Sequence, residues 1–213
     1  MPLHPRGPKR LIARACALPV DHMSCYILTA EPKTRYGDQL SKGQIVAPPD
    51  DSVVSEYGFL CKASKAAGFS HYEVSNFARP GGESQHNSAY WSGTPYLGIG
   101  PGAHSHRHTK RWWNGRSNAR YMQTAESQSL ELQREEEVLL PTDQFNEALI
   151  TGLRRAEGVD PNALLQASGL DVRAQSALSN LLKKGHCEWH QGHLRIPEVN
   201  WPMGDAITLE LMV

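Results

Sequence analysis

Four side chains suited to a flat, polar-edged ring lie within the six-residue run HNSAYW. His86 offers an imidazole, Asn87 an amide, Tyr90 a phenol and Trp91 an indole. Aromatic rings supply stacking area, and imidazole is a common protein ligand for iron. His86 and Tyr90 are four residues apart, so they share a face if this run forms a helical turn. The pattern indicates a site for an aromatic ligand, and it also fits a small satellite core that pins the segment in place.

Two neighbouring runs carry weaker signals. His104, His106 and His108 alternate in HSHRH, so on a strand all three would face one way, as ligands of zinc, copper or nickel could. The ordinary alternative is a row of exposed or hydrogen-bonded histidines. The glycines in GIGPG, residues 98–102, let a ligand or another backbone approach closely. As a nucleotide motif this run is weak, because no helix N-terminus is predicted behind it to bind phosphate.

The composition is that of a folded globular protein with balanced charge. The chain has 213 residues, of which 39% are hydrophobic and 21% charged, and its formal net charge is +0. Proteins that bind nucleic acid by its phosphates usually carry a basic excess, so we expect no nucleic-acid partner. No apolar run reaches the length of a membrane span, which leaves only peripheral membrane association open. The four cysteines form no CxxC pair, which favours free thiols over disulfides or a zinc knuckle.

The first part of the chain predicts a strand–helix–strand unit. Residues 22–30 are rich in β-forming side chains and predict a buried strand. Residues 50–68 predict a helix with acidic N-caps and a glycine stop. Residues 69–75 predict a second strand, and this order is typical of a βαβ unit. Residues 84–108 are predicted to be the long loop that follows.

The composition changes at residues 133–138, QREEEV, and the sequence after this run has the pattern of a small helical module. A helix with one apolar face is predicted after Pro141, a short one over residues 160–169, and another after Asp171. A hairpin that turns at residues 191–192 follows. Three helices and a hairpin describe a winged-helix-like module. Its third helix carries little charge, which favours packing against protein over binding DNA.

Several long motifs, taken together and in order, resemble one protein family. The motifs are YEVSNFARPG at residues 72–81, HNSAYW at 86–91, YLGIGPGAHS at 96–105, DHMSCYILTAEPKT at 21–34, NEALITGLR at 146–154 and GDAITLELMV at 204–213. From about residue 10 to its end, the chain resembles the HemW heme chaperones. These belong to the oxygen-independent coproporphyrinogen III oxidase-like family of radical-SAM proteins.

The resemblance implies an α/β fold in two parts. The expected fold is the C-terminal remnant of a partial (β/α) radical-SAM barrel, followed by a small, mostly α, winged-helix-like domain. Residues 1–130 would form the end of the barrel with the HNxxYW loop, and residues 131–213 the family's C-terminal helical domain. Residues 21–34 would be the last barrel strand and the loop after it.

One departure limits the chemistry that the resemblance implies. The family carries an early CxxxCxxC motif that ligates a [4Fe-4S] cluster, and this chain has no such motif. We therefore expect a C-terminal portion, from a split gene, a truncated sequence or a degraded copy. Such a portion would not cleave S-adenosyl-L-methionine by itself, and no catalytic residue is assigned. By resemblance, Thr29 and His104 lie where the family's barrel contacts S-adenosylmethionine, and that contact depends on the missing cluster half.

The resemblance leaves three functions open. The HNxxYW motif favours a portion of a heme chaperone, which would bind heme through His86, Asn87, Tyr90 and Trp91, with His86 as the axial ligand of the heme iron. The alternatives are a portion of an oxygen-independent coproporphyrinogen III oxidase, in porphyrin biosynthesis, and an inactive remnant. The implied partners are heme, heme-accepting proteins and a separate N-terminal radical-SAM half. The implied location is the cytoplasm.

Overall fold

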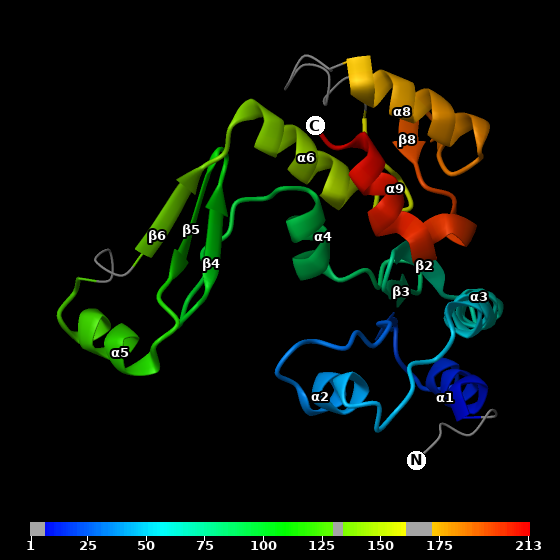
Figure 1. Cartoon of the computed structure of the whole chain (residues 1–213), viewed down its shortest axis with the longest axis horizontal. Helices are drawn as coiled ribbons and strands as arrows, with labels where there is room; N and C mark the ends of the chain where they lie inside the picture. Colours follow the sequence, from blue (N-terminus) through cyan, green and yellow to red (C-terminus); the bar gives the residue numbers. More distant parts are fainter. Residues whose placement is uncertain (1–6, 130–133, 161–171) are drawn as a thin grey trace. The chain divides into compact units, whose positions relative to one another are not determined.

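The computed structural model describes residues 7–129, 134–160 and 172–213 (Figure 1). The chain divides into two compact units. The first unit contains Met1–Ser84 together with Glu198–Pro202. The second contains Gln85–Pro197 and Met203–Val213. None of the described helices is long and apolar enough to cross a membrane.

The first unit is built on a three-stranded sheet. Its elements are α1 (Gly7–Cys16), β1 (His22–Ser24), α2 (Arg35–Ser41), α3 (Asp50–Ala66), β2 (Ser70–Glu73), β3 (Asn76–Ala78) and most of the 3-10 helix η2 (Glu198–Met203). The strand order is β1–β3–β2 and both pairings are antiparallel, so β1 and β2 run parallel to each other. The predicted βαβ unit is therefore present in a split form, with β3 inserted between its two parallel strands.

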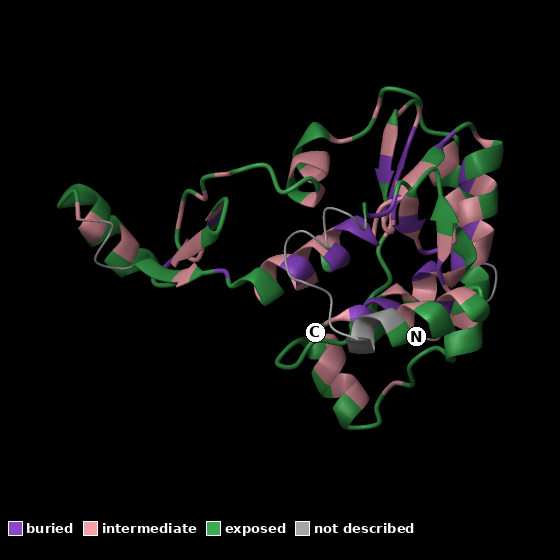
Figure 2. Cartoon of the chain, turned by 90° about the horizontal axis from the view of Figure 1, so that it is seen from above, coloured by how far each residue is buried: buried purple, intermediate pink, exposed green. Residues whose placement is uncertain are grey.

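β3 lies at the centre of the first unit, because all three of its residues are buried (Figure 2). Phe77 is fully buried and packs in one cluster with Met23, Leu60 and Phe69. Leu60 comes from α3, whose C-terminal end is followed by Gly68 at φ 84°, a left-handed conformation that favours glycine. The glycine stop of this helix is thus where the sequence predicts it.

The strand expected over residues 22–30 is shorter in the structure, because β1 covers only its beginning. The Cys25 N–H still donates to the Ser75 carbonyl at 2.7 Å, but the next five residues have no strand partner among the described residues. Tyr26 and Leu28 are 73% and 76% exposed. β-propensity reflects packing against neighbouring strands more than a backbone preference. This apolar run therefore stays irregular where no described strand lies beside it.

The second unit combines a three-stranded antiparallel sheet, a hairpin and several helices. Its elements are α4 (Gln85–Trp91), β4 (His104–Arg107), β5 (Lys110–Asn114), α5 (Asn118–Glu126), β6 (Arg134–Val138), α6 (Pro141–Gly152), α8 (Val172–Lys183), β7 (Glu188–His190), β8 (His193–Arg195) and α9 (Gly204–Leu211). The sheet order is β4–β5–β6. Sequence analysis missed these three strands because their side chains are mostly polar or charged and give no apolar alternation.

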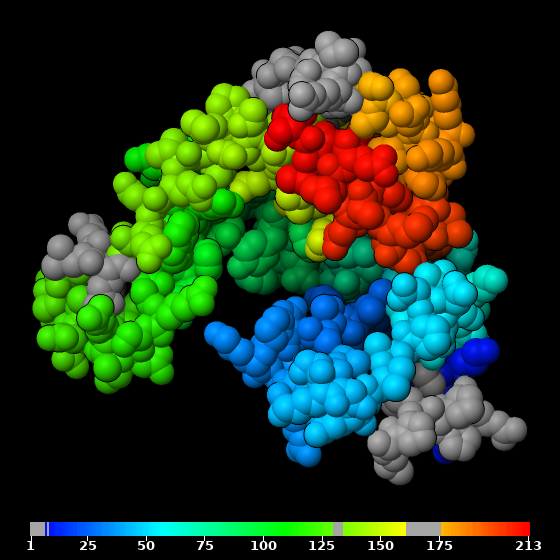
Figure 3. Space-filling view, in the orientation of Figure 1, coloured from blue at the N-terminus to red at the C-terminus, as the bar shows by residue number. Residues whose placement is uncertain are grey.

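The helical end of the second unit has its own core. α9 packs against both α6 and α8, and Figure 3 shows α8 and α9 side by side. The buried apolar side chains of this core are Phe145, Leu149, Leu153, Leu181, Leu194, Ile196, Ile207 and Leu211. The helices predicted after Pro141 and Asp171 are present, as is the hairpin, whose turn residues Gln191 and Gly192 have φ of 51° and 83°. The short helix predicted over residues 160–169 lies, after its first residue, outside the described residues.

The exposed apolar run after β1 predicts self-association of the chain. It borders a groove of about 570 Å³ whose lining is mostly apolar and includes Leu11, Met23 and Leu60. Exposed apolar surface of this kind binds hydrophobic dyes and promotes association. We expect the double change Tyr26→Ser with Leu28→Lys to reduce dye fluorescence and sedimentation of associated species. Its unfolding free energy should change by no more than about 0.5 kcal/mol, because both side chains are exposed.

A matched control is Leu209→Lys, since Leu209 is also exposed, at 68%, but lies on α9. This control should leave dye binding and sedimentation unchanged. A sharp monomeric peak with low dye binding for the unaltered chain would contradict the prediction.

Candidate functional site

The HNSAYW run folds as the short helix α4, and this places His86 and Tyr90 together. Their rings meet edge to face with centroids 4.8 Å apart, as the spacing of four residues predicts. Both residues are exposed, whereas Asn87 and Trp91 are partly buried. α4 therefore presents an imidazole and a phenol together to solvent.

Two further rings extend this pair within the second unit. The Tyr90 ring meets that of Tyr96 with centroids 4.6 Å apart, and Tyr96 lies 6.0 Å from the ring of His106. Tyr96 and His106 are also joined by two backbone hydrogen bonds of 2.9 and 3.0 Å. The result is an aromatic row: His86, Tyr90, Tyr96 and His106. The sequence alone indicated no role for Tyr96. Its ring contact with Tyr90 joins two segments of the chain that share no hydrophobic periodicity.

The glycines of GIGPG allow a close approach of the backbone to β4. A Cβ on Gly98 would overlap the carbonyl of His104. The Gly98 N–H donates to the Ser105 hydroxyl at 2.9 Å, and the Asn114 amide donates to the Gly100 carbonyl at 2.9 Å. These contacts hold the segment between Tyr96 and β4, and so fix the distance between Tyr96 and His106.

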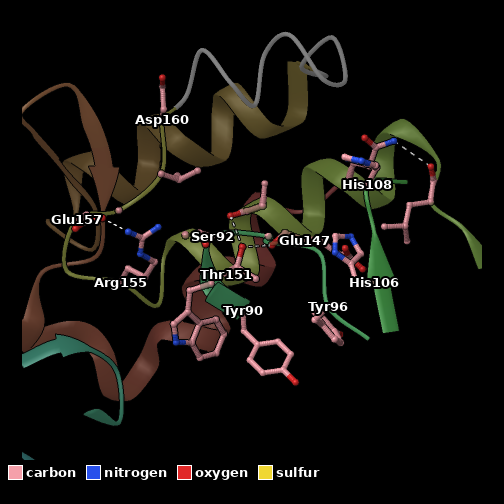
Figure 4. A pocket seen from close by; sticks show the side chains of 18 of the residues that line it. Tyr90, Ser92, Tyr96, His106, His108, Glu147, Thr151, Arg155, Glu157 and Asp160 are labelled. Carbon is pink, nitrogen blue, oxygen red and sulfur yellow. Dashed lines mark hydrogen bonds and ion pairs between the residues drawn. The ribbon is translucent and has the colours of Figure 1, made fainter. Parts of the chain in front are cut away.

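A pocket of about 680 Å³ lies beside the aromatic row (Figure 4). Its lining includes Tyr90, Trp91, Tyr96, His106, His108, Arg111, Glu147, Thr151, Arg155 and Glu157. This volume is within the range of pockets that bind small organic ligands. In Figure 4 the rings of Tyr90 and Tyr96 extend next to each other, while Glu147 and Thr151 come from α6. His86 contacts Tyr90 but is not part of this lining.

The pocket contains paired charges as well as rings. The Arg111 Nε donates to Glu137 Oε2 at 2.7 Å, and its guanidinium also pairs with Glu147. The hydrogen bond to Glu137 is the main cause that raises the pKa of Arg111, so this side chain stays cationic. Arg155 pairs with Glu157. The pocket lining therefore contains two cationic side chains, and each of them is already paired with at least one carboxylate.

Two groups at the pocket have unusual surroundings. The Trp91 Nε1–H is buried and meets no acceptor in the described part of the chain. A buried donor without a partner costs roughly 1–3 kcal/mol, which an acceptor on a bound ligand would recover. Burial raises the pKa of Tyr96, with a further contribution from Tyr90, so the Tyr96 phenol stays protonated at neutral pH.

The other residues singled out in the sequence do not belong to this row. Thr29 is exposed in the irregular segment of the first unit, and His104 is exposed on β4 in the second, stacked on Trp113 at 5.7 Å. His108 lies at the β4–β5 turn with φ 56°. Within the described ranges, His104, His106 and His108 do not group as potential metal ligands.

Comparison with known proteins finds similar sequences. Heme chaperone HemW from Mycobacterium tuberculosis (strain ATCC 25618 / H37Rv) is 32% identical over 204 residues, which is 95% of this chain and 50% of that protein. Heme chaperone HemW from Bacillus subtilis (strain 168) is 33% identical over 176 residues, 82% of this chain and 46% of that protein. The resemblance found in the sequence is thereby confirmed. The chain spans about half the length of the curated relatives it matches. No protein-family model matches the chain.

A solved structure gives the same indication for the fold. Coproporphyrinogen III oxidase (HemN) from Escherichia coli, described as a radical SAM enzyme, matches with a TM-score of 0.73 and 17% identity. The match covers 100% of this chain and 53% of that one. At this identity the likeness concerns the fold alone. It confirms the mixed α/β fold of the radical-SAM type that the motifs implied, although the described residues form no closed barrel.

The close approach at Gly98 generates a stability prediction. Gly98→Ala should destabilise the second unit by about 1–3 kcal/mol, because the added methyl group would overlap the His104 carbonyl. Thermal unfolding followed by circular dichroism measures this. The control is Gly58→Ala, where α3 leaves open space and the change should stabilise by roughly 0.5–1 kcal/mol. Equal effects of the two changes would show that Gly98 is not sterically required.

Proposed function

Because this chain is related in sequence to the HemW heme chaperones, we propose that it is a portion of a heme chaperone, which binds heme as cargo and passes it to heme-accepting proteins. The observation that carries the proposal is the aromatic row beside the pocket of the second unit. It joins an imidazole, two phenols and a second imidazole over short ring contacts. A porphyrin needs this combination of stacking area and iron ligand.

His86 is the proposed axial ligand of the heme iron. It is exposed on α4 and lies edge to face with Tyr90, so the phenol ring limits the orientations of the imidazole. An exposed ligand suits a carrier, since an acceptor protein can approach the same heme before it is released. Tyr90 and Trp91 would cover the macrocycle, and Asn87 would hydrogen-bond a propionate or fix the helix.

The pocket offers partners for the acidic edge of a porphyrin. Arg111 and Arg155 can exchange their carboxylate partners for propionates, because guanidinium groups bind carboxylates in a bidentate geometry. The Trp91 Nε1–H could donate to the same edge. His106 lines the pocket, so it is the second candidate ligand, ahead of His104, which is exposed on β4 and does not line the pocket.

The groups that radical-SAM chemistry would need fit this chain poorly. Its cysteines are Cys16, Cys25, Cys61 and Cys187, and no three of them lie together as metal ligands in the described ranges. The described residues therefore offer no set of cysteine ligands for a [4Fe-4S] cluster. The roles of Thr29 and His104 in contacting S-adenosylmethionine remain proposals that depend on a separate N-terminal half.

The finer arrangement of the chain is proposed along the same lines. Helices α6 and α8 with the β7–β8 hairpin support a winged-helix-like module within residues 131–213, after a barrel part in residues 1–130. A cytoplasmic setting is proposed from the family alone.

Hemin titration followed by absorbance tests the ligand assignment. His86→Ala should weaken hemin binding by about tenfold or more and shift the Soret band, because the iron loses its axial nitrogen. His104→Ala is the matched control and should change neither, since His104 stacks on Trp113 and is not part of the aromatic row.

Each other outcome has a defined meaning. If His106→Ala abolishes the band while His86→Ala does not, heme binding stands and the ligand assignment to His86 is wrong. If no variant alters the spectrum while circular dichroism shows intact folds, specific heme binding by this unit is contradicted. Porphyrinogen oxidation that appears only when an N-terminal radical-SAM half is added would favour the oxidase alternative.

A further inference from the structure

Three metal-ligating side chains meet in the first unit, which does not contain the aromatic row. Cys61 comes from α3, His71 from β2 and Glu198 from η2. One potential ligand atom from each lies within 4.8 Å of the other two. The Cys61 Sγ is 3.7 Å from His71 Nδ1, and the Glu198 Oε1 is 2.7 Å from the same nitrogen. The thiol sulfur and the carboxylate oxygen therefore both approach the same ring nitrogen of His71.

The His71 ring is held rigidly. It stacks on Phe77 with centroids 3.9 Å apart and an interplanar angle of 11°, and it meets the edge of Trp201 at 4.3 Å. Its side chain is only 6% exposed, whereas that of Glu198 is 49% exposed. The nitrogen Nδ1 thus has a fixed direction, and the half-exposed carboxylate lies where an ion from solvent can reach it.

The other nitrogen of the His71 ring has neighbours of its own. Nε2 lies 3.4 Å from the Val74 carbonyl and 3.5 Å from the Tyr57 hydroxyl, which donates to the same carbonyl at 3.0 Å. When the proton of the neutral ring is on Nε2, the lone pair of Nδ1 faces the carboxylate and the thiol. A cation between these atoms would remove the repulsion between the lone pair and the carboxylate.

We propose that Cys61, His71 and Glu198 bind a divalent cation of the zinc class. Zinc takes thiolate sulfur at about 2.3 Å and imidazole nitrogen at about 2.0–2.1 Å, which in a tetrahedron separates the two ligand atoms by roughly 3.6 Å. The observed 3.7 Å between Sγ and Nδ1 agrees with this spacing. The carboxylate needs a small outward rotation, and its exposure allows this. Water completes the fourth position.

The charges of the site balance on binding. The Cys61 thiol loses its proton to solvent, and the resulting thiolate with the Glu198 carboxylate neutralises a dication. Without an ion, burial raises the pKa of Cys61 to about 12, so the thiol is protonated at neutral pH and binding must release a proton. The Nε2–H donated toward a backbone carbonyl is the arrangement that usually orients a metal-bound histidine. Thiolate and imidazole ligands select zinc over magnesium or calcium.

The site would have a structural consequence that is separate from the proposed heme function. His71 and Glu198 are 127 positions apart in the sequence. An ion bound by both would connect η2 to the sheet of its own unit. It would stabilise that unit by a free energy that grows with the logarithm of the ion concentration above the dissociation constant. The rival reading is an ordinary histidine–carboxylate hydrogen bond that performs the same tie without an ion.

Metal titration of the full, heme-free, chelator-treated chain tests the proposal. Zn²⁺ is titrated against a chromophoric chelator, and Co²⁺ is used as the spectroscopic probe of a thiolate ligand. We expect one Zn²⁺ per chain and a thiolate-to-cobalt charge-transfer band. Cys61→Ser should abolish the band, and both Cys61→Ser and Glu198→Gln should weaken zinc binding at least tenfold. Cys25→Ser is the matched control, because Cys25 is a partly buried thiol of the same unit outside the cluster.

Thermal unfolding provides a second measurement, which does not depend on the cobalt absorption band. Zn²⁺ should raise the melting temperature of the unaltered chain and of Cys25→Ser, and should not raise that of Cys61→Ser. Glu198 is half exposed, so Glu198→Gln is expected to fold even if changes at Cys61 do not. Absence of a thiolate band, or zinc binding that is unchanged in both cluster variants, would overturn the proposal and leave the histidine–carboxylate hydrogen bond. His86→Ala should leave zinc binding intact, which separates this result from the fate of the heme proposal.

Discussion

The first unit depends on the burial of one short strand. β3 lies between β1 and β2, and none of Asn76, Phe77 and Ala78 is more than 2% exposed. A polar residue at such a position must find partners inside, and Asn76 does so by donating to the buried Glu73 carboxylate and accepting from the Ser24 hydroxyl. These bonds link all three strands through side chains as well as through the backbone. The direction of the His71 ring follows from the same burial, since that ring stacks on Phe77.

The second unit meets a different constraint, which is close packing of backbone against backbone. The segment from Tyr96 to Gly102 lies against β4 because Gly98 has no side chain and because Ser105 and Asn114 hydrogen-bond to its peptide groups. This packing brings Tyr96 beside His106, and α4 brings Tyr90 to Tyr96. Three segments that carry no apolar period thus assemble a row of rings and one wall of a pocket.

Charged side chains have different surroundings in the two units. In the pocket of the second unit, the cations Arg111 and Arg155 are each paired with carboxylates. In the first unit the carboxylate of Glu198 faces a nitrogen whose burial disfavours the charged form. Ion pairs at the surface contribute little to the free energy of unfolding. A polar or charged group without a suitable partner costs more free energy the more deeply it is buried.

The sequence by itself determined the features that depend on local order. The HNSAYW run placed His86 and Tyr90 on one face, the glycine stop ended α3, and the C-terminal hairpin turned at Gln191–Gly192. Its motifs also indicated the resemblance to the HemW heme chaperones, one of which is 32% identical to this chain over 204 residues.

Only the tertiary structure decided which distant residues meet. The strand expected over residues 22–30 is shorter in the structure, and the polar strands β4, β5 and β6 pair in one sheet. The side chains of Cys61 and His71 lie together with that of Glu198, which is far from them in the sequence. The physical reason is common to all three. Strand pairing and side-chain convergence depend on neighbours far away in the chain, and neither periodicity nor local propensity carries that information.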